Sequence, residues 1–391
     1  MEVAVFLDQR FWRTPDGTVW TPDSCAYSFF RRYLEIFDHV RAVARVRHVA
    51  AAGAGWKAAG GAGVTFSAAP HYLGPWEYLR HARAVKRAAR QALHGAPAVI
   101  LRVPSQLANC VEPLLRQTRR PYAVEVVGDP FDSYAPGAVQ HPLRPFLRRW
   151  LRRRLEAQCA ASAGASYVTA SVLQRRYPCA PGAFTACYSS VELPPEAFAI
   201  ETRSWAPKKS LRLISVGSLQ FPYKGFDLLI RALRSCRDDG LDAGLEIVGG
   251  GLLRDALEAQ AGALGVGRHV QFVGTLSPGE AVRARLDQAD LYVHASRAEG
   301  LPRALIEAMA RGLPCVASRA GGVAELLAPE DTVPVGDAAA LAGKISEVLR
   351  EPARMARMSV RNKCKALEYR EEILQQRRNE FYARLRDVTA A

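Results

Sequence analysis

Short apolar runs alternate with amphipathic segments along much of the chain. Runs such as VAVFLD from Val3 and APAVILRVP from Ala96 have the length and composition of buried strands. Other segments, such as SQLANCVEPLLRQ from Ser105, have apolar residues at helical spacing. Alternation of strand and helix is typical of a parallel sheet with helices on its faces, so the pattern predicts the α/β class. Further strands are expected at 40–46, 121–128, 166–171, 184–190, 211–216, 245–248, 269–274, 291–296 and 314–318.

The chain of 391 residues is long enough for two domains that each bury a core. We expect a first Rossmann-like domain over residues 1–192, in which TPDS, residues 21–24, opens a helix and the Gly/Ala-rich stretch 53–63 is a loop. A proline-rich polar linker is expected over 193–210. A second Rossmann-like domain over 211–370 and a terminal helix over 371–391 complete the expected order.

The clearest functional pattern lies between Leu291 and Glu325. LYVHAS predicts a buried strand, and ALIEAMA predicts a helix that begins near Pro302 and ends at Gly312. In parallel α/β sheets, ligands bind beyond the carboxyl ends of the strands, and the N–H groups of a helix start favour an anion. The loop 297–303 is therefore an expected ligand site.

Two carboxylates mark this strand–loop–helix unit, Glu299 in the loop and Glu307 in the helix. A carboxylate that accepts from vicinal hydroxyls forms strong charge-assisted hydrogen bonds, so the pair suits a sugar ligand. The alternative is that Glu307 is a solvated helix position and Glu299 a turn residue. Taken by themselves, the two residues fit either interpretation.

The same stretch resembles the E-x7-E signature of family 4 of the glycosyltransferases, retaining enzymes of the GT-B fold. The matching segments are 299–302, 307–310, 312–314 and 321–325. The likeness extends back through VGSLQFPYKGFDLLIRAL and LEIVGGG to about residue 211, whereas the first half matches only in layout. It implies an α/β GT-B fold: two Rossmann-like, doubly wound domains facing a central cleft, with the C-terminal helix crossing back to the first domain.

The resemblance implies a retaining hexosyltransferase that takes a UDP- or GDP-linked sugar as donor and needs no separate cofactor and no metal. Glu299 is expected to bind and orient the donor sugar, Glu307 to bind ribose hydroxyls, and Lys224 to meet the diphosphate as a point charge. No Asp-any-Asp motif follows a strand in the usual metal-chelating position. The expected nucleotide-binding residues also include Gly217, Ser218, Gly249, Gly250, Val273, Thr275, Leu276, Gly300, Leu301, Pro302 and Arg303.

The chain departs from the family pattern at two positions in the expected nucleotide and acceptor regions. Relatives often carry an arginine where this chain has Ser218, and Arg303 is a possible substitute for that charge. The family usually places a Gly-Gly loop after the first strand, where this chain has only Gly17.

A further difference follows the strand at 121–128. Many relatives have a histidine near here that touches the donor sugar, whereas this chain has Gly128 and Asp129. One hypothesis is that Asp129 or Asp132 orients a sugar hydroxyl. The other is a plain turn, since Gly, Asp, Pro and Ser are turn formers.

The segment HPLRPFLRRWLRRRLEAQ, from His141, predicts an amphipathic helix. One stripe is apolar and includes Trp150, and arginines between Arg144 and Arg154 cover the remainder. This pattern fits either a packing helix with a solvated basic face or a helix that contacts an anionic membrane surface.

The formal charge of +15 favours anionic partners. No aromatic–basic motif accompanies it, so we do not expect nucleic acid binding. The eight cysteines form no CxxC pair, which argues against a zinc or redox motif and suits a reducing cytosol. The N-terminus lacks a signal-peptide pattern, and no apolar run approaches the roughly 20 residues of a membrane span. We therefore expect a cytoplasmic protein, and the two interpretations of the arginine-rich helix leave open whether it is peripheral at the inner face of the membrane.

The expected reaction transfers a sugar to a glycan or lipid-linked acceptor in polysaccharide biosynthesis. The alternative hypothesis is a degenerate GT-B protein that binds nucleotide or docks on a membrane without transferase activity. Ser218 and the missing Gly-Gly loop are its only support.

Overall fold

The computed structural model describes residues 1–22, 25–139, 141–200, 203, 205 and 208–391. These form two compact units, the first from residues 1–128, 151–188 and 374–391 and the second from 129–150 and 189–373. This division differs from the expected boundaries, because 129–150 groups with the second unit. Part of the expected TPDS helix start, residues 23–24, lies outside the described residues, as do 201–202, 204 and 206–207 of the expected linker.

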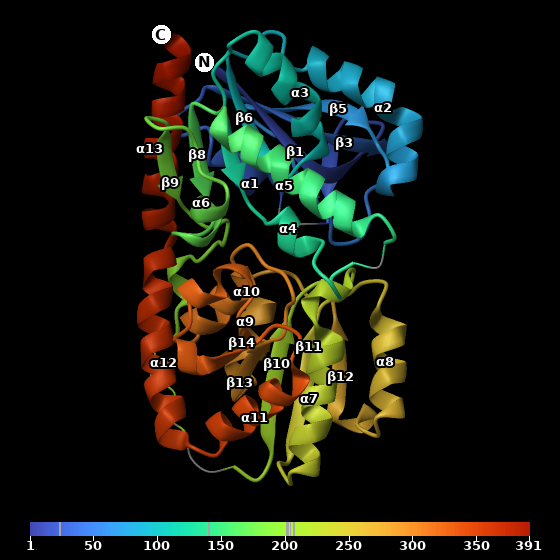
Figure 1. Cartoon of the computed structure of the whole chain (residues 1–391), viewed down its shortest axis with the longest axis vertical. Helices are drawn as coiled ribbons and strands as arrows, with labels where there is room; N and C mark the ends of the chain where they lie inside the picture. The colour runs from blue at the N-terminus through green and yellow to red at the C-terminus, as the bar shows by residue number, and fades with distance from the viewer. Residues whose placement is uncertain (23–24, 140, 201–202, 204, 206–207) are drawn as a thin grey trace. The chain divides into compact units, whose positions relative to one another are not determined.

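A nine-stranded sheet forms the centre of the first unit (Figure 1). Seven strands run parallel in the order β5-β3-β1-β6-β7-β8-β9, and β2 and β4 extend the sheet with antiparallel pairing. The strands are β1 (Glu2–Arg13), β2 (Val19–Thr21), β3 (His39–His48), β4 (Lys57–Ala58), β5 (Val64–Pro70), β6 (Ala98–Val103), β7 (Ala123–Val126), β8 (Gly164–Tyr167) and β9 (Phe184–Cys187).

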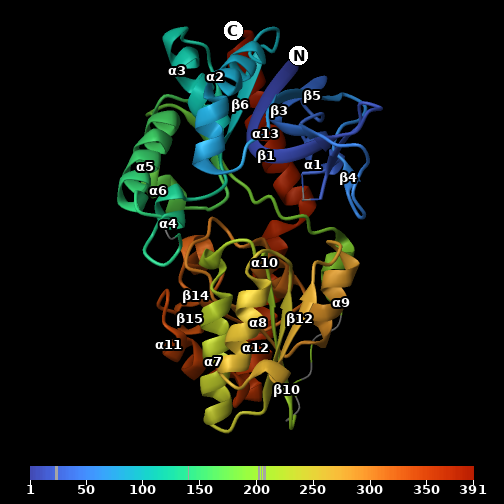
Figure 2. The same ribbon diagram turned by 90° about the vertical axis from the view of Figure 1, so that its right-hand side faces the viewer.

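Helices cover both faces of this sheet, with α2 and α3 on one side and α1 and α13 on the other (Figures 1 and 2). The pattern predicts neither β5 nor α2, and the expected loop 53–63 contains the short strand β4. The helices are α1 (Tyr27–Arg31), α2 (Gly74–Gln91), α3 (Gln106–Gln117), α5 (Arg144–Ala160), α6 (Val172–Arg176) and α13 (Glu371–Ala390). From residue 374 onward, α13 belongs to the first unit, so the C-terminal helix returns to that unit as expected.

The second unit is built on a six-stranded parallel sheet in the order β12-β11-β10-β13-β14-β15. Its strands are β10 (Leu211–Val216), β11 (Ala243–Val248), β12 (Val270–Gly274), β13 (Leu291–His294), β14 (Cys315–Ser318) and β15 (Thr332–Val333). Its helices are α4 (Pro130–Ser133), α7 (Phe226–Asp238), α8 (Arg254–Ala263), α9 (Glu280–Gln288), α10 (Arg303–Ala310), α11 (Ala338–Leu349) and α12 (Pro352–Ala366).

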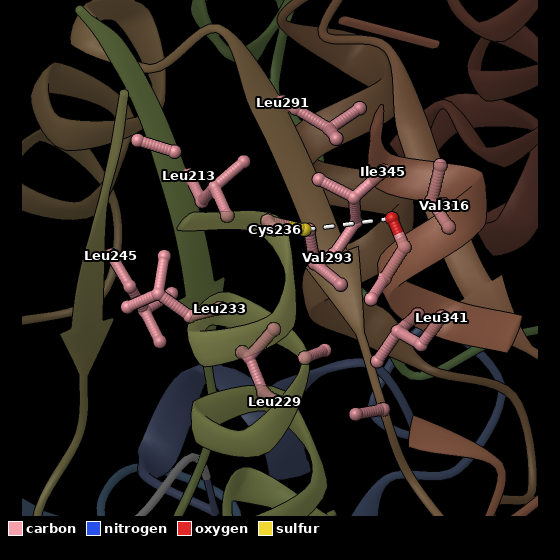
Figure 3. Packing of buried hydrophobic residues seen from close by; sticks show 14 of the residues in the cluster. Leu213, Leu229, Leu233, Cys236, Leu245, Leu291, Val293, Val316, Leu341 and Ile345 are labelled. Atoms are coloured by element: carbon pink, nitrogen blue, oxygen red, sulfur yellow. Dashed lines mark hydrogen bonds between the residues drawn. The ribbon is translucent and has the colours of Figure 1, made fainter. Parts of the chain in front are cut away.

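The core of the second unit lies between its sheet and the helices α7 and α11 (Figure 3). Leu213 and Val293 project from neighbouring strands toward Leu233 of α7 and Ile345 of α11, and all four are fully buried. All four residues of β13 are buried, as a parallel strand covered on both faces requires. This packing fixes the strand ends from which the functional loops leave.

A buried carboxylate joins the C-terminal helix to the first sheet. Glu125 of β7 accepts from the hydroxyl of Tyr382 in α13 at 2.8 Å and from Tyr188 at 3.1 Å. Its other oxygen accepts from Tyr33 at 2.9 Å and from the guanidinium of Arg102 at 2.8 Å. Burial raises the pKa of Glu125, but Arg102 and the hydroxyl donors outweigh this effect, so its pKa lies below the ordinary value. The carboxylate is therefore charged at neutral pH and fully paired.

We expect Tyr382→Phe to lower the free energy of unfolding by about 1.5–3 kcal/mol, since it removes one hydrogen bond to a buried charge. Urea denaturation measures this. The matched control is Tyr27→Phe, which removes a hydroxyl that donates to the Ala62 carbonyl at the surface and should change stability by less than about 0.5 kcal/mol. Equal effects of the two variants would show that Glu125 does not depend on Tyr382.

Candidate active site

Most of the residues that the sequence marks as functional lie in loops at the carboxyl ends of four neighbouring strands. These strands are β12, β11, β10 and β13, in this order across the second sheet. Since all their pairings are parallel, the four following loops leave the same edge of the sheet. The loop after β10 contains the 3₁₀ helix η2 (Pro222–Lys224), and the loop after β13 contains Glu299.

Glu299 and Lys224 form an ion pair, with Nζ of Lys224 2.6 Å from Oε1 of Glu299. The same oxygen accepts from the Ser296 hydroxyl at 2.7 Å and lies 2.9 Å from Nε2 of His294. An ionised carboxylate only accepts, so the imidazole donates here, and its Nδ1 lies 3.4 Å from the Tyr292 hydroxyl. Among the described residues every donor to this carboxylate reaches Oε1, which leaves Oε2 open to an incoming hydroxyl.

The charges of this pair stabilise each other. Burial alone raises the pKa of Glu299, but the charge of Lys224 and the hydrogen bond from His294 hold this pKa well below the ordinary range. For Lys224, burial lowers the pKa, and the charge of Glu299 raises it above its ordinary value. Both side chains are therefore charged at neutral pH, in a site where an unpaired charge is costly.

Arg297 fixes the segment that carries Lys224. Its guanidinium donates two bonds of 2.7 Å to the carboxylate of Asp227, in the first turn of α7. It also donates to the carbonyl of Pro222 at 3.0 Å, and its backbone N–H donates to the carbonyl of Tyr223 at 2.6 Å. A bidentate arginine–carboxylate pair fixes orientation as well as distance. Arg297 thus holds the chain on both sides of Lys224.

Two glycines allow the loops around Glu299 to approach one another. Gly225 has a φ of 71°, and a Cβ there would collide with the carbonyl oxygen of Ala295. Gly321 has a φ of 51°, at the start of the 3₁₀ helix η4 (Gly321–Glu325), and a Cβ there would collide with the carbonyl oxygen of Glu299. The backbone of Glu299 is therefore supported from the loops after β10 and β14.

Glu307 is partly buried in α10, and burial raises the pKa of its carboxyl above the ordinary value. The charge of Arg303, at the exposed first position of α10, partly opposes this shift and also lowers the pKa of Lys224. That Arg303 supplies the positive charge missing at Ser218 stays a prediction. Within the part of the chain that the structure describes, the Glu307 carboxylate accepts no hydrogen bond and remains open to ligand hydroxyls.

The glycine run 249–251 packs against the chain's own backbone. The N–H of Gly249 donates to the carbonyl of Gly274, and the N–H of Leu219 donates to the carbonyl of Gly250, both at 2.9 Å. These glycines allow a close approach between neighbouring loops, and their contact with a nucleotide stays a prediction. These bonds bring together the expected residues Gly217, Ser218, Gly249, Gly250, Val273, Thr275 and Leu276 at one edge of the sheet.

Two further expected positions have local roles in the structure. The exposed Ser218 accepts from the N–H of Gln220 at 3.2 Å and so stabilises its own turn. Asp129 is buried and caps α4, where it accepts from the N–H of Phe131 at 2.9 Å. This cap agrees with the turn interpretation of 128–134, and a role in orienting a sugar hydroxyl stays a prediction.

His294, Ser296 and Arg297 are not among the site residues expected from the sequence. His294 and Ser296 alternate along the end of LYVHAS, so both lie on the face of the strand end that meets Glu299. That alternation is the signal that could have revealed them. Arg297 has no comparable signal, because its partner Asp227 is 70 residues away along the chain. Among the described residues, no group of three or more His, Cys, Asp or Glu side chains is arranged to hold a metal ion.

Comparison with known proteins places this site in a recognised family region. Residues 199–365, which contain Lys224, Glu299 and Glu307, match the family Glycosyl transferases group 1. Protein CapJ of Staphylococcus aureus is 27% identical over 315 residues, which cover 79% of this chain and 78% of CapJ. A Mycolicibacterium smegmatis protein, described as a GDP-mannose-dependent alpha-(1-6)-phosphatidylinositol monomannoside mannosyltransferase, is 36% identical over 157 residues. That match spans only 38% of this chain and 41% of that protein.

Solved structures resemble the whole chain. Sucrose-phosphate synthase from Thermosynechococcus elongatus has a TM-score of 0.71 at 18% identity, covering 99% of this chain and 100% of that one. HepE of Anabaena, in complex with UDP-glucose, has a TM-score of 0.66 at 15% identity, again covering 99% and 100%. At these identities the likeness establishes the fold, and it confirms the predicted α/β GT-B fold. Assignment to family 4 and to its E-x7-E motif stays a prediction.

We expect Arg297→Lys to lower the free energy of unfolding by about 1.5–3 kcal/mol, because a lysine cannot reproduce the bidentate bond to Asp227. The matched control is Arg231→Lys, which alters an exposed partner of the same carboxylate and should cost less than about 1 kcal/mol. Urea denaturation of both variants measures the difference. Equal losses of unfolding free energy in the two variants would contradict the role of Arg297 in holding the segment that carries Lys224.

Proposed function

We propose that this protein is a retaining glycosyltransferase that moves a sugar from a UDP- or GDP-linked donor to a glycan or lipid-linked acceptor. The observation that carries the proposal is the buried Lys224–Glu299 pair at the ends of β10 and β13. The family match over 199–365 and the relatives named as glycosyltransferases support the same reaction class. The intact charge pair argues for an enzyme rather than a degenerate binding protein.

The leaving diphosphate requires positive charge, and stabilisation of developing charge is usually the largest catalytic term. In the proposed complex, Lys224 exchanges part of its interaction with Glu299 for the diphosphate, and Arg303 adds the second cation. Backbone N–H groups of Gly300, Leu301 and Arg303 lie at the start of α10, where the helix dipole also favours an anion. The glycines of the loops after β10 and β11 shape the remainder of the diphosphate site.

The two carboxylates have different tasks in this scheme. Glu299 accepts from hydroxyls of the donor sugar through Oε2, while its other oxygen stays bound to the protein. Glu307 accepts from ribose hydroxyls, and the main chain of Val273 to Leu276 contacts the base. The bond from the anomeric carbon to the diphosphate oxygen breaks, and the acceptor oxygen bonds on the same face. The departing phosphate oxygen takes the acceptor's proton.

The acceptor is proposed to be a precursor of a polysaccharide or lipid-linked glycan. The relatives include a protein named for a phosphatidylinositol mannoside substrate and one named for amylovoran biosynthesis. None of the described helices combines the length and apolar character that a membrane crossing demands. A cytoplasmic enzyme with a lipid-linked acceptor would therefore have to reach the membrane through its surface.

The helix α5 is one proposed contact with an anionic membrane surface. Of the arginines between Arg144 and Arg154, Arg148 stacks on Phe131 at 3.6 Å, and Arg154 donates to the Asn109 carbonyl at 3.0 Å. Such inward contacts favour the packing interpretation for part of the helix. The residues left exposed are Phe146, Arg149, Trp150 and Arg153.

We expect Glu299→Gln to abolish sugar transfer and Glu307→Gln to act mainly on nucleotide binding. Loss of one charged hydrogen bond costs about 1.5–3 kcal/mol, or roughly 10- to 150-fold in affinity for UDP or GDP. Calorimetric titration with each nucleotide and a transfer assay measure the two effects. Near-normal turnover by folded Glu299→Gln would remove that residue from the site, and unchanged affinity of Glu307→Gln would contradict the ribose role.

The pH dependence of nucleotide affinity distinguishes the role of Glu307 from that of Glu299. Because burial raises the pKa of Glu307 above its ordinary 4.5, nucleotide affinity of the wild type should fall as pH is lowered through that raised value. Protonation removes the negative charge that strengthens hydrogen bonds from ribose. Glu307→Gln should lack this step, whereas Glu299, with its depressed pKa, should remain ionised throughout.

We expect donor hydrolysis and transfer to persist in excess EDTA, since Lys224 and Arg303 supply the positive charge for the leaving group. The assay compares initial rates with and without chelator. Complete loss in EDTA, restored by magnesium or manganese ions, would contradict a metal-independent reaction.

A further inference from the structure

The helix α2 of the first unit has an inner face that is apolar and an outer face that is not covered. Val85 and Ala89 are fully buried in the core of this unit, and Tyr78 packs against Tyr72. Trp76 lies half a turn away from Val85 around the helix axis, at about 100° per residue. In both views α2 lies on the outside of its unit (Figures 1 and 2).

Five cations share the exposed side of α2: Arg80, Arg83, Lys86, Arg87 and Arg90. Their spacing of three and four residues places them along one side of the helix, over a length of roughly 15 Å. The single acid of the helix, Glu77, accepts from the N–H of Leu73 at 2.6 Å at the opposite end.

No carboxylate among the described residues neutralises these five cations. Several exposed arginines on other helices do have such partners. In α7, Arg231 pairs with Asp227 and Arg234 with Asp238, and in α8, Arg254 pairs with Glu258. Within the part of the chain that the structure describes, the positive charge of α2 is therefore uncompensated, and these side chains are exposed to solvent.

Large apolar side chains are exposed at the N-terminal end of the same helix. Trp76 is 75% exposed, Leu79 is 62% exposed, and Leu73, just before the helix, is 49% exposed. Their spacing of three residues groups them at one end of the outer face. Exposed apolar groups beside a basic stripe mark an interaction site more clearly than scattered single residues do.

We infer that the outer face of α2 binds an anionic phospholipid bilayer. Leu73, Trp76 and Leu79 enter the interfacial region, where an indole is favoured because it has an apolar body and a polar N–H. The cations from Arg80 to Arg90 contact the phosphates of the headgroups. This inference rests on the proposed function and adds to it a second membrane contact besides α5, and neither α2 nor its cations belong to the nucleotide site.

A bilayer explains both parts of this face. Nucleic acid would satisfy the cations, but it would leave Leu73 and Leu79 without an apolar partner. An acidic protein would need an apolar pocket that is complementary in shape to the exposed side chains. The apolar interior of a bilayer accepts them without such a fit. The combination of uncompensated cations and adjacent exposed leucine and tryptophan therefore favours lipid.

The full-length protein is sedimented with vesicles of equimolar phosphatidylglycerol and phosphatidylcholine and with vesicles of phosphatidylcholine alone. Wild type should bind the anionic vesicles, and binding should weaken as salt rises. Arg83→Glu/Arg87→Glu should lower the partition coefficient at least 25-fold, at roughly fivefold for each cation lost. Trp76→Ser/Leu79→Ser should lower it at least tenfold, by loss of interfacial burial.

Matched controls carry the same chemical changes elsewhere. Arg254→Glu/Arg357→Glu reverses two exposed arginines, and Leu252→Ser removes an exposed leucine. These variants should bind as wild type does. Arg149→Glu/Arg153→Glu, in α5, tests the other helix in the same assay. Circular dichroism and hydrolysis of the donor in solution verify for each variant that the fold and the nucleotide site remain intact.

Tryptophan fluorescence gives a second readout. The chain has six tryptophans, so the contribution of Trp76 is the difference between wild type and Trp76→Phe. This difference should shift to shorter wavelength on addition of anionic vesicles, as expected for an indole that leaves water.

Four results would overturn the inference. They are absence of wild-type binding at low salt, wild-type binding by either α2 variant, loss of binding in the α5 variant alone, and equal affinity for heparin or duplex DNA that does not depend on Trp76 and Leu79. Each leaves donor hydrolysis in solution unaffected. A failure of the proposed transferase activity would instead abolish hydrolysis and leave vesicle binding unchanged.

Discussion

Burial of a charged carboxylate is the constraint on which both units depend. A carboxylate removed from water must receive several donors, and here each unit supplies them from segments far apart in sequence. Glu125 receives hydroxyls from three tyrosines and a guanidinium, and one of those tyrosines belongs to the last helix. Glu299 receives an ammonium, an imidazole and a hydroxyl. The two clusters differ in one respect. Glu125 uses both oxygens within the protein, whereas Glu299 uses only one, and that difference separates a structural carboxylate from one that can accept a ligand.

Most of the fold follows from hydrophobic periodicity, but not all of it. Strands such as β6 and β13 are mostly buried and largely apolar, which a sequence pattern identifies directly. The helix α2 escapes the same approach, because only Val85 and Ala89 are buried and arginines and alanines occupy most other positions. The arginines that prevent a prediction of α2 from hydrophobic periodicity are also the residues that make its surface basic. The short helix α4 is missed for another reason, since its GDPFDS sequence is equally typical of a turn.

The candidate site was predictable from the sequence only where its residues stand in local motifs. Glu299, Glu307 and Lys224 stand in motifs whose spacing is local, so a family resemblance finds them. The partners of Glu299 depend on how loops meet, and Arg297 reaches Asp227 across 70 residues of chain. The glycine run 249–251 shows the reverse case. Its freedom of backbone was predictable, but its close packing against the loop after β10 was not, and contact with a ligand stays a prediction. Local chemistry can therefore be predicted from local sequence, whereas the choice of partner requires the fold.

Net charge alone does not identify the basic surface of this protein. The excess of 15 positive charges is spread over the sequence, and many arginines have structural partners. Arg203 donates to the carbonyls of Arg311, Ala289 and Leu286, and Arg45 donates to those of Tyr72 and Asp8. Such residues act as multidentate links between backbone segments, and their charge is not presented to a partner. The cations of α2 differ from these arginines. Among the described residues, no carboxylate and no carbonyl accepts a hydrogen bond from them. A group of cations on one helix indicates a binding surface more specifically than the net charge of the chain does. It has a position, a length and an apolar end that a partner must match.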